Sequence, residues 1–360
     1  MKKSLFFLPF LLILTSLHAQ TAKYSNEFLS LGVGARGLSM SNSMVSLADG
    51  VTAAYWNPAG LAQPGKRYQL ALMHAAYFAN IANYDYAGLS YKMDSLSAVA
   101  LTFIRLGVDD ILNTTQLVDN NGNFDYGKIS KFSTADMAFM FSYSRGFKAV
   151  KGLTVGGGVK VIRRRIGDFA GAWGFGLDLG VQYRIKGWHT GLCLRDATST
   201  FNAWTYHLSE SVINAFQQTG NELPVNELEL TLPELLIGAG KYVDFGKGFN
   251  ATVALDLDFT LDGKRNTLIS SKAICIDPHF GMEFAYKKIV ALRAGIGNFQ
   301  RERDFDGKNK TTLQINLGIG VSIKEIVTID YALTDIGNLS VAPYSHVFSL
   351  KVELDRFKRK

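Results

Sequence analysis

Charged side chains at alternate positions of apolar segments are the groups in this sequence that could do chemistry. They are carboxylates and basic groups: Asp178, Asp256, Asp258, Glu353, Asp355, Lys160, Arg184, Lys324 and Lys351. Alternate positions of a strand share one face, so these groups would meet on one side of a sheet. There they would form internal ion pairs or line a polar conduit.

No sequence motif of an enzyme accompanies these charges. The sequence has no Gly-x-x-x-x-Gly-Lys-Ser/Thr phosphate loop, no Gly-x-Ser-x-Gly nucleophile elbow and no His-Glu-x-x-His zinc motif. The histidines after residue 20 lack metal-ligand spacing: His74, His189, His207, His279 and His346. We therefore expect a protein that is not an enzyme and that needs neither a cofactor nor a metal.

The elements that carry these charges alternate between apolar and polar residues, which is the pattern of strands. The alternation is clearest from Trp173 to Ile185 and recurs in segments 252–260, 313–324 and 348–355. These segments match the roughly nine to eleven residues of a membrane strand better than the five or six of a soluble one. Their apolar face would meet lipid and their polar face a lumen.

About fourteen such strands follow one another between residues 67 and 360. Their connections alternate between tight turns and mostly longer loops, of which 109–133 and 197–231 are the longest. This parity is typical of single-chain bacterial outer-membrane barrels. The sequence predicts an all-β membrane protein, an antiparallel transmembrane barrel of about fourteen strands. Leu179 would face lipid and Gly180 the lumen, where a serine should be milder than an arginine at Leu179. Cys193 and Cys275 would stay free on strands that are not neighbours.

Residues 1–19 have the pattern of a secretory signal peptide. Lys2 and Lys3 precede an apolar run from Leu5 to Leu17, and Ala19 offers a small residue at the cleavage site. Loss of the two lysines lowers the net charge from +7 to +5. The remaining basic residues are scattered, so no nucleic-acid partner is expected. We expect export by the general secretory pathway to a Gram-negative outer membrane, among lipid and lipopolysaccharide.

Residues 20–66 lack the strand pattern and would form a hatch inside the barrel. Helix-like apolar spacing runs through residues 38–49, and Pro58 would end any helix before it. A barrel of about fourteen strands leaves an open lumen unless something fills it. Four apolar hatch residues could line a pocket for a hydrophobic small molecule: Phe28, Leu29, Met40 and Met44.

The hatch carries a motif that resembles a known family. The runs 28–36 and 52–62, with Gly34, Arg36 and the segment Asn57-Pro58-Ala59, are similar to the opening of PorV/PorQ-type proteins. These belong to the broader FadL-like barrels. Later runs such as Asp330-Tyr331-Ala332 also resemble the family. The hatch is closer to the generic branch than to PorV proper, which implies a paralogue.

The resemblance implies a fourteen-stranded barrel with an N-terminal hatch, associated with type IX secretion in Bacteroidetes-like bacteria. Extracellular loops would then dock the secretion translocon or its secreted cargo. Leu208, Val212 and Phe216, in a segment with helical spacing between Ser209 and Gly220, are candidate contacts for such a partner. The alternative is a FadL-like channel for a hydrophobic small molecule.

Overall fold

The structure, a computed structural model, describes residues 25–77, 80–117, 122–303, 309–337 and 344–355. The predicted signal peptide, residues 1–19, lies outside these ranges. Among the described residues, every helix is too short or too polar to cross a membrane.

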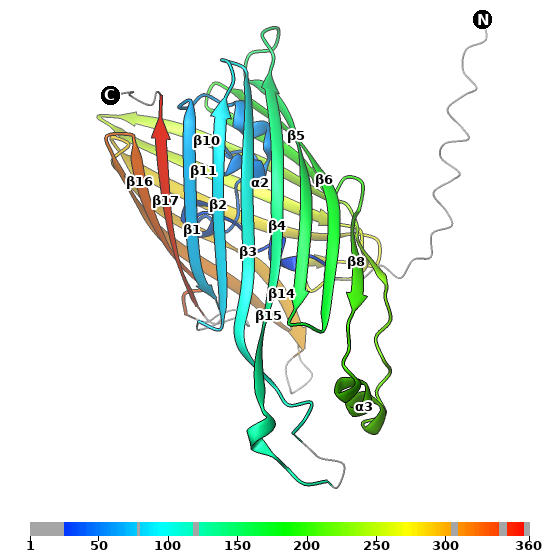
Figure 1. Cartoon of the computed structure of the whole chain (residues 1–360). Helices are drawn as coiled ribbons and strands as arrows, with labels where there is room; N and C mark the ends of the chain where they lie inside the picture. The colour runs from blue at the N-terminus through cyan, green and yellow to red at the C-terminus, as the bar shows by residue number, and fades with distance from the viewer. Residues whose placement is uncertain (1–24, 78–79, 118–121, 304–308, 338–343, 356–360) are drawn as a thin grey trace, which may run out of the picture.

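One antiparallel sheet closes on itself, because β1 pairs with β2 on one side and with β17 on the other (Figure 1). Its strands are β1 (Tyr68–Tyr77), β2 (Ala82–Lys92), β3 (Ser97–Asn113), β4 (Ser130–Gly146), β5 (Leu153–Ile166), β6 (Ala170–Ile185), β7 (Trp188–Arg195), β8 (Thr200–Tyr206), β9 (Leu228–Thr231), β10 (Glu234–Gly246), β11 (Phe249–Thr260), β12 (Ile269–Ser270), β13 (Cys275–Tyr286), β14 (Val290–Arg303), β15 (Asn309–Ile323), β16 (Val327–Thr334) and β17 (Ser345–Leu354).

These segments make fourteen barrel strands, which confirms the predicted fold. Strands β7 and β8 both pair with β6 and form one strand interrupted at 196–199. Strand β9 pairs with β8, and β10 pairs with β7. Together β9 and β10 form the next barrel strand, which is interrupted at Leu232-Pro233. The two-residue β12 only extends the loop onto β13.

The two longest predicted loops hold more regular structure than expected. Strands β3 and β4 continue into 109–133, which also holds the short helix η4 (Tyr126–Lys128). Region 197–231 contains β8, β9 and the helix α3 (Glu210–Gln218), of which only the helix was expected. Segments β8 and β9 were missed because each is short and the break at 196–199 interrupts the alternation.

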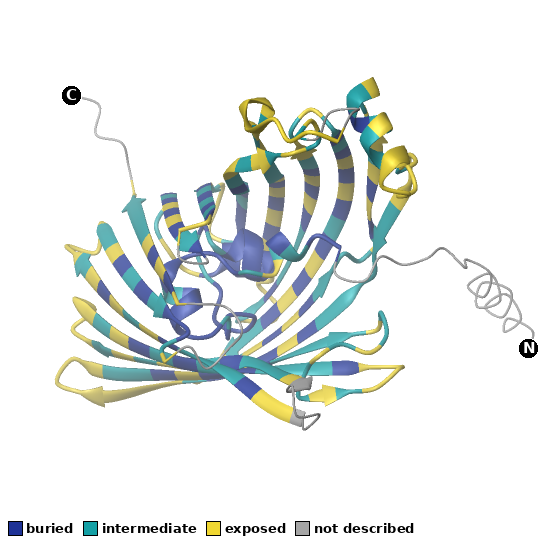
Figure 2. Cartoon of the chain, turned by 90° about the horizontal axis from the view of Figure 1, so that it is seen from below, coloured by how far each residue is buried: buried dark blue, intermediate teal, exposed yellow. Residues whose placement is uncertain are grey.

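The strand faces follow the predicted phase. On β6, Trp173 is 58% exposed and Leu179 is 52% exposed, whereas Asp178 and Gln182 on the other face are buried. Figure 2 shows the same stripes of buried and exposed residues along many strands. Because the exposed side chains form an apolar exterior, the barrel is built to stand in lipid. Cys193 and Cys275 are both free and buried, as expected.

The hatch lies within the ring of strands (Figures 1 and 2). Its described elements are η2 (Glu27–Leu29), α1 (Ala35–Ser39), α2 (Ala53–Trp56) and η3 (Pro58–Ala62). Nearly all its residues from Val33 to Gln63 are buried. The hatch core and the inner faces of the neighbouring strands form one apolar cluster, which includes Phe28, Met40, Met44 and Trp56.

Glycines on the inner face of the wall allow the hatch backbone to come close. A Cβ at Gly156 would lie 2.5 Å from the carbonyl carbon of Pro58, and one at Gly191 would lie 2.3 Å from the carbonyl oxygen of Val45. A Cβ at Gly295 would lie 2.4 Å from the carbonyl carbon of Met40. The glycines of the polar strand faces are therefore the surface on which the hatch rests.

Gly180 belongs to the same surface, so a serine there meets the hatch, and its effect relative to a charge at Leu179 stays a prediction. A Cβ at this position would lie 2.0 Å from Asn57 Oδ1 and 3.1 Å from Pro58 Cδ. The lumen is filled at this height, so a side chain at 180 must displace the hatch. The strand phase was correct, but the alternation alone does not show what occupies the lumen.

Candidate functional site

Asn57 fastens the hatch to the barrel wall. Its side-chain amide donates to the carbonyl oxygens of Val45 (3.0 Å), Val181 (3.2 Å) and Leu192 (3.3 Å). Its Oδ1 accepts from the N–H of Ala59 and caps the start of η3. The Asn57 side chain is fully buried, so each bond also removes the cost of an unpaired polar atom.

The remaining motif residues lie on both sides of this anchor. Pro58 begins η3, and the Ala59 carbonyl accepts from Ser144 on β4 at 2.8 Å. Gly34 adopts a left-handed conformation (φ 79°) just before α1, and its N–H points at the sulfur of Met73. The structure thus brings Asn57, Pro58 and Ala59 together at β4–β6, whereas Gly34 lies at β1.

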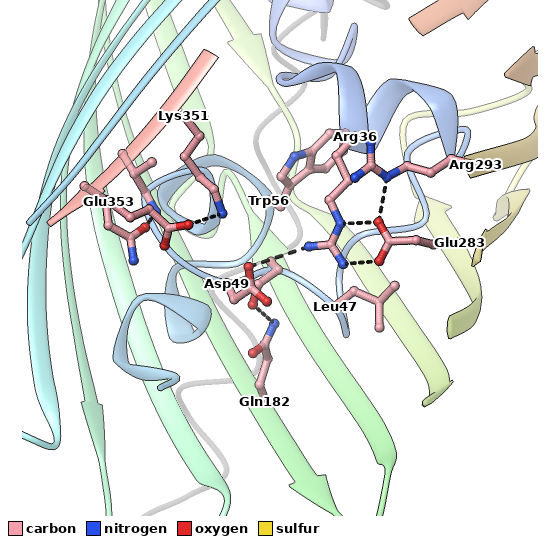
Figure 3. Close-up of polar contacts among 12 residues, drawn as sticks. Arg36, Leu47, Asp49, Trp56, Gln182, Glu283, Arg293, Lys351 and Glu353 are labelled. Atoms are coloured by element: carbon pink, nitrogen blue, oxygen red, sulfur yellow. Dashed lines mark hydrogen bonds and ion pairs between the residues drawn. The ribbon is translucent and has the colours of Figure 1, made fainter. Parts of the chain in front are cut away.

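Arg36 attaches α1 to strands β13, β14 and β16 of the wall through a chain of ion pairs (Figure 3). Its guanidinium group donates twice to the Glu283 carboxylate, at 2.9 and 3.1 Å. Glu283 also accepts from Arg293 at 2.6 Å, and Arg293 pairs with Asp330 at 2.7 Å. A two-bonded guanidinium–carboxylate pair fixes orientation as well as distance. Arg36 therefore sets the position of α1 relative to β13, β14 and β16.

A second polar contact fixes the segment that follows α1. Arg184 on β6 donates to the carbonyl oxygens of Leu47 (2.9 Å) and Ala48 (2.8 Å). Asp49 lies 3.6 Å from Arg36 and 3.8 Å from Arg184. Burial alone would raise the pKa of Asp49, but these two guanidinium groups outweigh it and hold that pKa below its ordinary value.

Two cavities lie on opposite sides of the hatch. The outer cavity, at the end with the long loops, has a volume of about 680 Å³. It is lined by residues near the loop ends of the strands, such as Tyr77, Thr260 and Ser345. The inner cavity, at the end with the short turns, has a volume of about 430 Å³ and is lined by residues such as Asn250, Lys288 and Thr328.

The side chain of Trp56 separates the two cavities, because it lines both. Leu38 of α1 lines the outer cavity and Gly37 the inner one. The indole nitrogen of Trp56 donates to the carbonyl oxygen of Val33 at 3.1 Å. A Cβ at Gly37 would lie 2.7 Å from the indole ring, so the helix and the ring are in close contact. Trp56 and α1 thus lie between the two cavities.

The predicted hydrophobic pocket is not formed by the four residues assigned to it. Phe28 and Met40 are buried in the hatch core, and Leu29 packs against that core. Of the four, only Met44 lines either cavity. The carbonyl group of Met40 instead faces Gly281 on the wall. The apolar spacing correctly indicated burial, but packing against a glycine-lined wall leaves only Met44 of the four beside a cavity.

The three proposed partner contacts lie on or beside α3. Val212 is 4% exposed, and Leu208 and Phe216 are half-buried. Ser211 of this helix accepts from Gln116 of the other long loop at 3.2 Å. The apolar face of α3 is thus covered mainly by the chain itself, and docking of a partner there stays a prediction.

The lumen charges singled out from the sequence mostly form ion pairs. Lys160 lies 2.8 Å from Asp178 and 2.7 Å from Asp196, in the interruption between β7 and β8. Asp256 accepts from the N–H of Val45, and Lys351 lies 2.9 Å from Glu353. Among the described residues, no cluster of His, Cys, Asp or Glu is arranged to hold a metal ion.

Sequence reasoning missed Trp56, Glu283 and Arg293 as site residues. Trp56 adjoins the Asn-Pro-Ala motif, and its position there was the one available signal. Glu283 and Arg293 belong to strands far along the chain, and only closure of the barrel brings them to Arg36.

No family model matches the sequence, and no curated protein matches it. The structure, however, resembles solved outer-membrane channels along nearly their whole length. One is the CymD monoaromatic hydrocarbon channel, with a TM-score of 0.58, 11% identity, and coverage of 91% of this chain and 98% of that one. The chain has the fold of these channels.

Two further structures have this FadL-like fold. The Ralstonia pickettii toluene transporter TbuX matches with a TM-score of 0.55 and 14% identity, covering 90% of this chain and 98% of its own. A Pseudomonas aeruginosa FadL homologue matches with a TM-score of 0.51 and 13% identity, over 90% and 98% of the two chains. At these identities the FadL-like fold is what the proteins share.

Proposed function

We propose that the protein is an outer-membrane channel for a small molecule, closed at rest by its hatch. The observation that carries this proposal is the pair of cavities of about 680 and 430 Å³ that meet at Trp56. Volumes in this range suit small ligands. The apolar exterior of the barrel supports the membrane location, and the FadL-like neighbours support the outer membrane as its site.

The polar anchors of the hatch suit a movable partition better than a permanent filling. Arg36, Asp49 and Glu283 line the inner cavity directly. Arg36 is 30% exposed and Asp49 is 37% exposed, so this pair lies beside water and can exchange partners at a lower cost than a fully buried one. The Asn57 contacts, by contrast, are fully buried. We infer that the hatch stays attached near Asn57 while α1 and Trp56 shift.

Transport through a channel involves no covalent step, and the expectation that the protein is not an enzyme stays a prediction. A docking role in type IX secretion also stays a prediction. Neither a family model nor a curated relative supports that role, and the neighbours' names describe hydrocarbon channels.

A reversible tether tests the channel. An ideal Cβ at Gly297 lies 3.3 Å from the Cβ of Ser41 in the hatch, close to the roughly 3.5–4.5 Å of a disulfide. The variant Ser41→Cys/Gly297→Cys, with Cys193 and Cys275 replaced by serine, is reconstituted in liposomes. Solute flux should fall on oxidation and return on reduction.

The two single-cysteine variants are the controls and should respond to neither treatment. Flux that is the same in the oxidised and reduced tether would contradict a moving hatch. Absence of flux of every solute, charged, polar or aromatic, in the untethered protein would contradict the channel itself.

A further inference from the structure

The outer cavity has a mixed lining: slightly more than half of its surface is apolar, and the rest comes from an unusually large number of polar side chains. The lining residues with mainly apolar side chains are Leu31, Leu38, Trp56, Tyr77 and Leu236. Ligand pockets are ordinarily apolar with a few polar groups. Here most of the described lining residues can hydrogen-bond, so the solute that fits must bring hydrogen-bonding groups of its own.

The polar groups divide into an amide side and a charged side. The amide side comes from the hatch, β14 and β15, with Asn42, Asn298, Gln300, Gln314 and Asn316. The charged side comes from η2, β7, β10, β11, β13 and the loop after β11, with Glu27, Arg195, Glu234, Asp258, Arg265, Asp277 and His279. Four carboxylates on this side stand against two guanidinium groups and one imidazole.

The carboxylates are more open to the cavity than the cation between them. His279 Nε2 lies 3.3 Å from Asp258 and 3.7 Å from Asp277. The imidazole is only 11% exposed, whereas the two carboxylate side chains are 20% and 24% exposed. Glu27 pairs with Arg265 at 3.2 Å and is 41% exposed, against 20% for the guanidinium group. The surface that a solute meets is therefore rich in acceptors.

We propose that the outer cavity takes small polyhydroxylated solutes without negative charge, of about monosaccharide size. Hydroxyl groups can donate to the carboxylates and both donate to and accept from the amides. The solute's C–H surface would lie on Trp56 and Leu38 at the floor. This inference rests on the proposed channel and names the class of solute that it admits.

A hydrocarbon fits this lining poorly. Covering the charged side with an apolar molecule would strip water from groups that then lack a partner, at roughly 1–3 kcal/mol each. An organic anion would meet an excess of carboxylates. The chemistry of this cavity therefore differs from the toluene and monoaromatic hydrocarbons named for the structural neighbours.

Two measurements with the same four probes test the assignment. Equilibrium dialysis of the full-length barrel in detergent measures binding of glucose, glucosamine, gluconate and toluene. Flux of the same probes is measured in liposomes. We expect glucose and glucosamine to bind and pass, and gluconate and toluene to do so at least about tenfold less. Toluene lacks the hydroxyl groups that the site is built for. Gluconate has them, but its carboxylate would face the carboxylates of the lining.

The isosteric variants Asp277→Asn and Glu27→Gln identify the surface responsible. Each should weaken glucosamine binding by about tenfold, which is the effect of one lost bond to a charged group. Each should also increase the affinity for gluconate relative to the affinity for glucose. Asp168→Asn, at a 94% exposed carboxylate outside the cavity, is the matched control and should change nothing.

The outcomes separate this inference from the channel. Passage of toluene without binding or passage of glucose would overturn the solute class and leave the channel standing. Binding of glucose with no flux of any probe would uphold the cavity assignment and overturn the channel. Binding that is unchanged in both cavity variants would overturn the assignment to this surface.

Discussion

Replacing Trp56 by alanine should open a continuous path through the barrel. The indole is the side chain that lines both cavities, so its removal joins a space of about 680 Å³ to one of about 430 Å³. Truncation of a buried tryptophan costs about 3–5 kcal/mol, and here it also removes the bond to the Val33 carbonyl. That cost falls on the hatch, because Trp56 makes no strand pairing.

Single-channel conductance in planar bilayers measures the path directly. We expect Trp56→Ala to show a steady open level where the parent protein shows mostly closed ones. In cells the same variant should increase sensitivity to antibiotics that the outer membrane normally excludes. Assembly of the barrel is checked separately by its heat-dependent shift in gel mobility, which should match that of the parent protein.

Trp173→Ala is the matched control, because this tryptophan is 58% exposed on the lipid-facing side of β6. It should leave conductance unchanged. If Trp56→Ala assembles normally and its conductance equals that of the parent, Trp56 is not the partition. The reasoning from the two cavities would then be refuted.

Three further predictions concern the wall and the anchors of the hatch. Leu179→Arg places a charge toward lipid, so it should reduce the yield of assembled barrel by a penalty of about 2–4 kcal/mol. Gly180→Ser should assemble and leak, because its side chain meets the hatch. Equal assembly of both variants with no leak from either would contradict the filled lumen. Arg36→Ala should raise conductance by loosening α1, a loss of up to about 3 kcal/mol. Asp110→Asn, in an exposed pair with Lys131 outside both cavities, should not. Equal effects would show that the pair to Glu283 is not an anchor. Ser43 is buried, so a cysteine introduced there, with the native cysteines replaced, should resist a bulky thiol reagent until the protein is unfolded. Rapid labelling of this cysteine in the native barrel would place the segment outside the lumen.

The barrel could be predicted from the sequence. The two-residue alternation from Trp173 to Ile185 predicted which side chains face lipid, and the count of such alternating segments predicted the number of strands. Both signals are local, because strand phase depends only on neighbours two residues apart. The same reasoning failed for β8 and β9, where four inserted residues interrupt the alternation and the pairing with β6 resumes beyond them.

The contacts of the hatch and the position of the cavities became visible only in the folded protein. Sequence spacing marked Met40 as buried and Gly180 as a lumen residue, but their partners are a wall glycine and Asn57. Arg36 meets Glu283 across 247 positions of the chain. Such contacts depend on closure of the barrel, which brings strands that are far apart in the sequence next to the same part of the hatch. A cavity is the volume that packing leaves over, so no local pattern could predict the partition at Trp56.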